Sequence, residues 1–346
     1  MHATVFHGPG DVRVEQVPDP RIEQSTDALV RITHACICGS DLWPYRGINP
    51  WQEGWRLGHE FIGVVEEVGA DVRTVARGQR VLAPWYFCDG ACEFCHDGLS
   101  TSCVQGGGWG ARNNGGQAEG IRVPWADGTL VALPDGLDDD DPVFAAIATL
   151  TDVMATGHHA AVAAQTRRGG TVAVVGDGAV GLCGVLAARR LGAERIIAVG
   201  HHPARLDIAR GFGATDVVSG DDEAAAAAVR ELTAGGAPSV LECVGTKAAM
   251  DLSFAIARAG GTVGFVGQPH GTDVVNIRRM FRDNVALRGG VATVRDYIPQ
   301  LLPEVLAGTL DPSPVLDMTV TLDDVPRGYA AMDQRRALKV LVRTGV

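Results

Sequence analysis

Four cysteines gather in one short stretch of this sequence and could do metal chemistry. Three, two and seven residues separate them, and the set is Cys88, Cys92, Cys95 and Cys103. Thiolates spaced this closely can form a closed tetrahedral zinc site that holds a loop together. Core cysteines are a poor alternative interpretation, because the residues between them include the polar Asp89, Glu93 and His96. The spacing therefore predicts a structural zinc site.

A second set of metal-ligand residues is spread along the chain. Cys38 lies in the segment CICGSD, and Glu60 follows His59 in the segment GHE. A catalytic zinc takes a small number of protein ligands and keeps one position open for a substrate oxygen. Two ligands are too few, and Asp152 in TLTDVMATG is a third candidate. From the residues alone, a hydrogen-bonded Asp in a helix is an equally good interpretation of Asp152.

A glycine-rich loop indicates a dinucleotide site. The apolar residues 171–175 run into GDGAVG, and a helical pattern follows. In this context Gly176 suits the turn, Gly178 suits close approach of a pyrophosphate, and Gly181 suits packing of the helix. Such a loop between a strand and a helix predicts a site for NAD or NADP.

The end of the next strand bears on the choice of dinucleotide. An NAD site usually carries Asp or Glu there to hold the ribose 2′-OH, whereas this chain reads AVGHHPAR and has Gly200 at that position. We expect NADP, because His201, His202 and Arg205 could donate to a 2′-phosphate. The alternative is that Arg205 is a surface helix residue and that Gly200 tolerates either cofactor.

The elements that must position these residues fall into two patterns. Up to about residue 134, short apolar runs broken by Gly, Pro and Asp predict irregular β structure with long loops. Beyond the acidic run at residues 138–141, strand and helix patterns alternate, which predicts a doubly wound parallel sheet. The six strand candidates are residues 171–175, 195–199, 216–218, 239–241, 262–266 and 285–288. A last strand, at residues 339–343, could return to the first domain.

Composition narrows the class of protein. With 346 residues, 46% of them apolar and 21% charged, the chain can fill two domain cores. It carries no apolar run long enough to cross a bilayer and no signal-like N-terminus, so we expect a cytoplasmic protein with reduced cysteines. A formal net charge of -11 argues against nucleic acid or an anionic membrane as partners.

The motifs together resemble a known family over essentially the whole chain. The segments CGSD, GHE, GDGAVG and GGTVGFVG and the cysteine cluster are similar to those of a zinc-dependent alcohol dehydrogenase of the medium-chain dehydrogenase/reductase superfamily. The resemblance implies an α/β fold in which a β-rich, GroES-like catalytic domain (residues 1–148 and 290–346) is interrupted by a Rossmann domain (residues 149–289). It implies hydride transfer between NAD(P) and a small alcohol, aldehyde or ketone, in a homodimer or homotetramer.

The resemblance also implies roles for particular residues. Cys38, His59 and Asp152 would bind a catalytic Zn²⁺, with Glu60 nearby as an exchangeable ligand. The family has two residues between the first two cysteines of its structural site, whereas three residues separate Cys88 from Cys92. Counting back from Cys92, the family's first ligand position is occupied by Asp89. We nevertheless favour Cys88 as the ligand, because soft ligands suit zinc clusters.

Two further residues have expected catalytic tasks. Ser40 is placed to accept the alcohol proton, and Asp41 is expected to hydrogen-bond the non-ligating nitrogen of His59. Many relatives have a His shortly after CGSD that passes protons to solvent, but this chain has Trp43 there. We therefore expect the proton to leave through water or the cofactor ribose.

Two competing functions remain open at this point. A zinc-free NADPH-dependent quinone or enoyl reductase has the same fold, but such enzymes lack the Cys38 and His59 ligands. A zinc protein that senses nucleotide without turning over a substrate is the other candidate, and failure to act on any alcohol or aldehyde would support it.

Overall fold

Two compact units make up the chain. The computed structural model describes residues 1–110, 115–138, 140–270 and 275–345. Contacts divide the chain into Met1–Asp152 with Thr293–Val346, and Val153–Ala292. We propose these units as the two domains, whose boundaries the sequence predicted near residues 148 and 290. The α/β fold class predicted from the sequence is confirmed.

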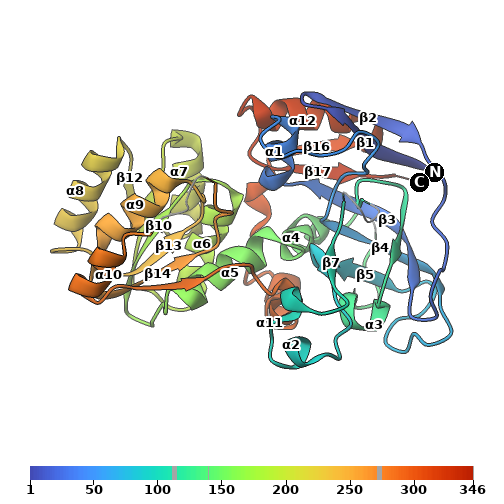
Figure 1. Cartoon of the computed structure of the whole chain (residues 1–346), viewed down its shortest axis with the longest axis horizontal. Helices are drawn as coiled ribbons and strands as arrows, with labels where there is room; N and C mark the ends of the chain where they lie inside the picture. Colours follow the sequence, from blue (N-terminus) through green and yellow to red (C-terminus); the bar gives the residue numbers. More distant parts are fainter. Residues whose placement is uncertain (111–114, 139, 271–274, 346) are drawn as a thin grey trace. The chain divides into compact units, whose positions relative to one another are not determined.

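The first unit is built on a mixed β-sheet. Among the described residues it has seven strands in the order β16-β17-β3-β4-β5-β9, with β8 pairing with β3 as well. Figure 1 shows β3, β4 and β5 side by side. The strands are β3 (Ala28–Ile37), β4 (Phe61–Val68), β5 (Arg80–Ala83), β8 (Gly120–Val123), β9 (Val131–Ala132), β16 (Met318–Thr321) and β17 (Val340–Arg343).

Smaller elements complete the first unit. Two short strand pairs lie outside the main sheet, namely β1 (His2–Gly8) with β2 (Asp11–Gln16) and β6 (Tyr86–Phe87) with β7 (Gly107–Gly108). The helices are η1 (Gly39–Asp41), α1 (Leu42–Tyr45), α2 (Glu93–His96), η2 (Ser100–Ser102), α3 (Ala126–Thr129), α4 (Val143–Leu150), α11 (Val294–Leu306), η3 (Ser313–Val315), η4 (Leu322–Asp324) and α12 (Val325–Asp333).

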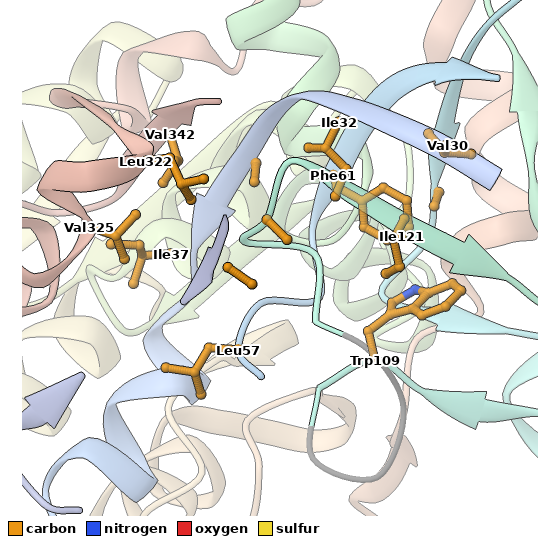
Figure 2. Close-up of a cluster of buried hydrophobic side chains, with 14 of the residues drawn as sticks. Val30, Ile32, Ile37, Leu57, Phe61, Trp109, Ile121, Leu322, Val325 and Val342 are labelled. Atoms are coloured by element: carbon orange, nitrogen blue, oxygen red, sulfur yellow. The ribbon is translucent and has the colours of Figure 1, made fainter. Parts of the chain in front are cut away.

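An apolar core holds this sheet in place. Along β3, Val30 and Ile32 alternate with more exposed residues, so their side chains share one face of the strand and enter the core. Figure 2 shows them together with Phe61, Ile121 and Trp109, which come from three other segments. Trp109 is 7% exposed, and its ring contacts Phe61 edge-on. This tryptophan is therefore part of the packing of the unit.

The second unit is a parallel sheet with helices. Within the described residues its strands follow the order β12-β11-β10-β13-β14-β15, and every neighbouring pair is parallel. The strands are β10 (Thr171–Val175), β11 (Arg195–Val199), β12 (Asp216–Val218), β13 (Ala237–Glu242), β14 (Ala257–Phe265) and β15 (Ala286–Gly289). The helices are α5 (Val153–Ala163), α6 (Ala179–Arg190), α7 (Pro203–Phe212), α8 (Asp222–Leu232), α9 (Lys247–Ile256) and α10 (Ile277–Asp283).

The strand order places the chemistry of this unit. Chain order reverses between β10 and β13, and ligands of doubly wound sheets bind beyond the carboxyl ends of the strands at such a reversal. Gly176 follows β10 and Gly200 follows the adjacent β11, so both lie at that edge.

None of the helices in the described part of the chain has the length and apolar character needed to cross a membrane.

Candidate active site

Four side chains of the first unit converge on one point. Cys38, His59, Glu60 and Asp152 each offer a ligand atom, and these atoms all lie within 4.8 Å of one another. Asp152 Oδ2 is 3.5 Å from Cys38 Sγ and 3.5 Å from His59 Nε2. The structure thus brings together the four residues that the resemblance implied as a catalytic zinc set.

Strand pairing explains most of this convergence. Cys38 follows β3, and His59 and Glu60 precede β4. The two strands are antiparallel neighbours in which Ala35 pairs with Phe61, so the end of one lies beside the start of the other. Asp152 belongs to a different segment and lies two residues after the end of α4. Only the fold brings Asp152 near residues more than 90 positions earlier.

Asp41 fixes the orientation of the His59 ring. Asp41 Oδ1 lies 3.2 Å from His59 Nδ1, which leaves Nε2 facing Asp152. The other oxygen of Asp41 accepts hydrogen bonds from the Cys38 N–H at 3.0 Å and from Gln117 Nε2 at 3.3 Å. A carboxylate partner on the distal nitrogen is the usual way in which a metal-binding imidazole is held in one tautomer.

The donor set suits a cation. Burial lowers the pKa of His59, but Asp41 and Asp152 outweigh it, and the pKa lies well above its ordinary value. Burial and the neighbouring Asp152 raise the pKa of the Cys38 thiol. Glu60 Oε2 is buried and has no hydrogen-bond partner among the described residues. A buried thiol and a buried carboxylate with an unpaired oxygen, together with a half-buried imidazole and a half-buried second carboxylate, are the ligand types that bind zinc.

Lys339 is a buried residue beside the site that sequence reasoning missed. It directly precedes β17, and its Nζ lies 2.7 Å from Glu60 Oε1. Both side chains are buried, with exposures of 1% and 0%. Burial lowers the pKa of Lys339, but Glu60 and the two nearby thiols raise it further, so the ammonium stays charged. The available signal was a single Lys inside the apolar run ALKVLV.

Ser40 lies at the edge of the cluster. Its Oγ is 3.5 Å from His59 Nε2, and the residue is half-buried in η1. Trp43 lies in the following helix α1. The Ser40 hydroxyl therefore lies beside the ligand atom of His59, as the thiol of Cys38 does.

The cysteine cluster forms around a different first residue from the one the sequence favoured. Ligand atoms of Asp89, Cys92, Cys95 and Cys103 lie within 4.8 Å of one another. Asp89 Oδ1 accepts hydrogen bonds from the Cys92 N–H at 3.0 Å and from Cys95 Sγ at 3.3 Å. Burial raises the pKa of Asp89, but the Ala91 and Cys92 N–H groups outweigh it and lower the pKa to about 2.

Cys88 lies near the thiols of Cys95 and Cys103, but its hydrogen bonds to α3 distinguish it from Asp89. Its Sγ donates to the Gly128 carbonyl at 3.2 Å, and its N–H donates to Thr129 Oγ1 at 3.1 Å. The extra residue before Cys92 leaves Asp89 at the position where relatives have their first cysteine, so Asp89 turns toward the three thiols and Cys88 turns toward α3. Our preference for Cys88 over Asp89 therefore differs from the grouping in the structure.

The glycine-rich loop has the geometry that its sequence predicts. Gly176 has φ +114°, and a Cβ there would lie 2.7 Å from Val244. A Cβ on Gly181 would lie 1.9 Å from the Gly176 carbonyl oxygen, which shows how closely α6 approaches the turn. Gly178 is the N-cap of α6, and a Cβ there would meet no described atom within 4 Å. An anion can therefore approach the backbone at the start of α6.

A carboxylate that sequence reasoning missed lies at the end of β11. Asp177, the second residue of GDGAVG, accepts hydrogen bonds at Oδ2 from the His201 N–H at 2.7 Å and the His202 N–H at 2.8 Å. The His202 ring nitrogen Nδ1 is 2.9 Å from the same oxygen, and Arg205 Nη1 is 3.8 Å from Oδ1. An acidic side chain therefore lies beside Gly200, although it comes from the loop after β10 and not from β11.

Comparisons with known proteins agree with this arrangement. Residues 24–135 match the family model described as the alcohol dehydrogenase GroES-like domain, and residues 179–307 match that of the zinc-binding dehydrogenases. The chain is 33% identical to zinc-type alcohol dehydrogenase B of Aspergillus flavus, over 100% of this chain and 82% of the relative. It is 37% identical to a probable zinc-binding alcohol dehydrogenase of Mycobacterium tuberculosis, over 97% and 86%.

A solved structure is similar over nearly the whole length. Alcohol dehydrogenase TADH from Thermus sp. ATN1 superposes with a TM-score of 0.92 at 35% identity, and 99% of each chain is covered.

Proposed function

We propose a residue-level mechanism from one premise: the chain belongs to the zinc-type alcohol dehydrogenases of the medium-chain dehydrogenase/reductase superfamily, and it is an NAD(P)-dependent oxidoreductase. Its substrates are small alcohols and the corresponding carbonyl compounds. The prediction of a zinc- and nicotinamide-dependent enzyme is confirmed at this level. Neither a zinc-free reductase nor a nucleotide sensor without turnover has support from these relatives.

The observation that carries the mechanism is the convergence at Asp152. We assign Cys38 Sγ, His59 Nε2 and Asp152 Oδ2 as the catalytic zinc ligands, because these atoms lie within 4.8 Å of one another and the set includes both soft and hard donors. Glu60 is the fourth, exchangeable ligand. When bound there, zinc supplies a Lewis acid that lowers the pKa of the alcohol hydroxyl.

The remaining steps belong to this chain's own side chains. Asp41 keeps the proton of His59 on Nδ1, so that Nε2 keeps its lone pair for the metal. Ser40 Oγ accepts the proton of the alcohol and passes it on through water or the cofactor ribose, since Trp43 offers no relay of the imidazole kind. In the second unit, Gly176, Gly178 and Gly181 shape the loop that cradles the pyrophosphate of the dinucleotide.

A second, structural zinc belongs to the cysteine cluster. We assign Asp89, Cys92, Cys95 and Cys103 as its ligands, with Cys88 as the alternative first ligand. The support is that the first four residues offer ligand atoms within 4.8 Å of one another, whereas Cys88 Sγ donates to a backbone carbonyl. Three thiolates and one carboxylate can give the closed tetrahedral coordination typical of structural zinc.

The choice between NADP and NAD is the finer part of the proposal. NADP was predicted because Gly200 replaces the usual acidic residue and because His201, His202 and Arg205 could hold a 2′-phosphate. His202 and Arg205 do lie beside Gly200, and their partner is Asp177. Selectivity therefore depends on whether a 2′-phosphate competes with that carboxylate.

We also propose a homodimer or homotetramer in a reducing cytoplasm. The family resemblance supports an oligomer, and the free thiols of the eight cysteines suit a reducing compartment. Light scattering coupled to size-exclusion chromatography measures the oligomeric state directly.

The experiment that tests the mechanism is a panel of primary, secondary and aromatic alcohols and their carbonyl compounds, with NADP and with NAD. Absorbance of the reduced nicotinamide reports turnover. The Ser40→Ala variant should lose at least about 100-fold in kcat with unchanged zinc content, because general acid–base groups contribute on that order. Ser219→Ala, which removes an exposed hydroxyl in the second unit, is the control. Full turnover of Ser40→Ala would reduce Ser40 to a turn residue.

A further inference from the structure

The end of β11 contains a buried carboxylate in an unusual place. The carboxylate belongs to Asp177, which follows Gly176 in the glycine-rich loop. Its side chain accepts hydrogen bonds from the two residues after Gly200. The Asp177 side chain is 10% exposed, so the contacts to it are largely shielded from water. Strand β11 itself ends without an acidic residue.

Gly200 and Asp177 occupy one another's space. A Cβ built on Gly200 would lie 2.6 Å from Asp177 Cβ and 2.6 Å from its Oδ2. Real Cβ atoms essentially never approach this closely, so a side chain at position 200 and the present position of Asp177 exclude each other. The glycine therefore marks a site where the carboxylate comes from the neighbouring loop instead of from the strand.

The donors around this carboxylate are those that a phosphate would use. Two consecutive backbone N–H groups, of His201 and His202, point at Oδ2, and they lie just before helix α7, whose N-cap is His202. The His202 imidazole and the Arg205 guanidinium approach the same carboxylate. Paired N–H groups near a helix N-terminus, with an Arg beside them, bind phosphate oxygens well.

The charge of Asp177 is stable. Burial raises the pKa of Asp177, but hydrogen bonds from His202 and His201 outweigh it, and the pKa lies below its ordinary value. The carboxylate is therefore ionised at neutral pH and accepts hydrogen bonds only. A ribose hydroxyl can donate to such a group, whereas a phosphate is repelled by it.

We propose that Asp177 is a specificity-determining residue for the dinucleotide: its carboxylate occupies the donors that a 2′-phosphate needs and lowers the affinity for NADP relative to NAD. This inference rests on the proposed function, namely that the loop from Gly176 to Gly181 binds the dinucleotide. It assigns discrimination to a loop residue, whereas the sequence pattern directs attention to the end of the strand.

Binding measurements without substrate test the inference. The dissociation constants of NADH and NADPH, and of the probes 5′-ADP and 2′,5′-ADP, are measured by calorimetry on the whole protein. Asp177→Asn keeps the shape of the side chain and removes its charge. The NADPH-to-NADH ratio of dissociation constants should fall about tenfold, because opposed like charges commonly cost at least that much affinity. The ratio for 2′,5′-ADP over 5′-ADP should fall in parallel.

A matched control separates local from general electrostatics. Asp207 lies on helix α7 two residues after Arg205 and is exposed, so Asp207→Asn makes the same change in net charge. The NADPH-to-NADH ratio of dissociation constants of Asp207→Asn should stay at the wild-type value. In Asp177→Asn combined with Arg205→Met, most of the gain in NADPH affinity should disappear, because Arg205 is the cation that Asp177 no longer pairs with.

Each outcome decides the inference. An unchanged ratio in a folded Asp177→Asn protein overturns it, and so does an equal shift in Asp207→Asn. If Asp177→Asn does not fold, Asp177→Ser, which keeps a hydrogen-bond acceptor, must give the same fall in ratio. If the wild type binds neither dinucleotide, the proposed function fails and the inference fails with it. If it binds both and oxidises alcohols while the ratio stays constant, only the role of Asp177 is lost.

Discussion

Lys339 Nζ lies 2.7 Å from Glu60 Oε1, and both side chains are buried in the first unit. The ammonium arrives from the C-terminal segment, 279 residues after the carboxylate that it neutralises. Glu60 uses one oxygen for this ion pair, and its other oxygen has no described partner. Lys339 therefore holds Glu60 beside the ligand atoms of Cys38, His59 and Asp152 and balances the negative charge of the cluster.

Breaking this pair should destabilise the protein strongly. In Lys339→Met the buried carboxylate of Glu60 would lose its ammonium partner, and removing one partner of a buried ion pair typically costs about 3–5 kcal/mol. Urea unfolding of the zinc-loaded protein measures the change. Lys247→Met is the control, because it removes an exposed ion pair with Asp251 and should change the free energy of unfolding by no more than about 1 kcal/mol. Equal stability of the two variants would contradict a structural role for Lys339.

A methyl group at Gly200 should disturb the second unit. Because the added Cβ would overlap Asp177, Gly200→Ala should cost about 1–3 kcal/mol, as overpacking usually does. Combining it with Asp177→Gly removes the clash, so the double variant should lose less stability than the sum of the single changes. Thermal unfolding of all four proteins gives the coupling. Strict additivity would mean that the two residues do not share the space.

Metal analysis distinguishes the two candidate first ligands of the structural site. Asp89→Ala should lower the zinc content from two ions per chain to about one or make the second ion readily lost to a chelator, because three thiolates leave the coordination incomplete. Cys88→Ala should retain both ions, since its thiol donates to a backbone carbonyl. The reverse pattern would assign the ligand role to Cys88.

The ion pair between Asp216 and Arg195 predicts a pH dependence. Hydrogen bonds from Arg195 Nε and Nη2 at 3.0 and 3.1 Å hold the pKa of Asp216 below its ordinary value of 3.8. A depressed pKa in the folded state contributes stability that is present above pH 3.8 and is lost as the pH falls through the folded value. Asp216→Asn should therefore lower the free energy of unfolding at neutral pH and lose this effect at strongly acidic pH.

Urea titrations of both proteins at several pH values measure that difference. The partly exposed position of the pair keeps the effect small. A difference between Asp216→Asn and wild type that does not vary with pH would remove Asp216 from the account of acid stability.

Local pattern predicted the second unit well. Strands at residues 171–175, 195–199 and 216–218 coincide with β10, β11 and β12, because buried parallel strands are short apolar runs bounded by turns. The helix expected after GDGAVG begins within that segment, at Ala179, since Gly178 acts as its N-cap. The end of each element depends on caps and close contacts, which apolar pattern alone does not report.

The site residues that sequence reasoning missed share one property. Lys339 and Asp177 act through partners brought near by the fold, and neither stands in a position where its residue type alone signals a role. Asp89 was considered as a ligand from the sequence, but Cys88 was preferred because a thiolate suits a zinc cluster. Cys38 and His59 were predicted because thiol and imidazole ligands are distinctive, whereas a buried Lys or Asp is recognisable only once its partner is known. From the sequence, Asp152 could equally well be a hydrogen-bonded Asp in a helix. Its Oδ2 lies 3.5 Å from Cys38 Sγ in the structure, which favours the ligand role.

The central claim is that Cys38, His59 and Asp152 hold a zinc ion on which alcohol oxidation depends. Zinc content and alcohol-dependent reduction of NAD(P), measured on the same samples of wild type and Asp152→Asn, test it most directly. The account predicts about two zinc ions per chain and steady turnover in the wild type, and the loss of one ion together with most of the turnover in the variant. An Asp152→Asn protein that keeps both ions and its full activity would contradict the claim.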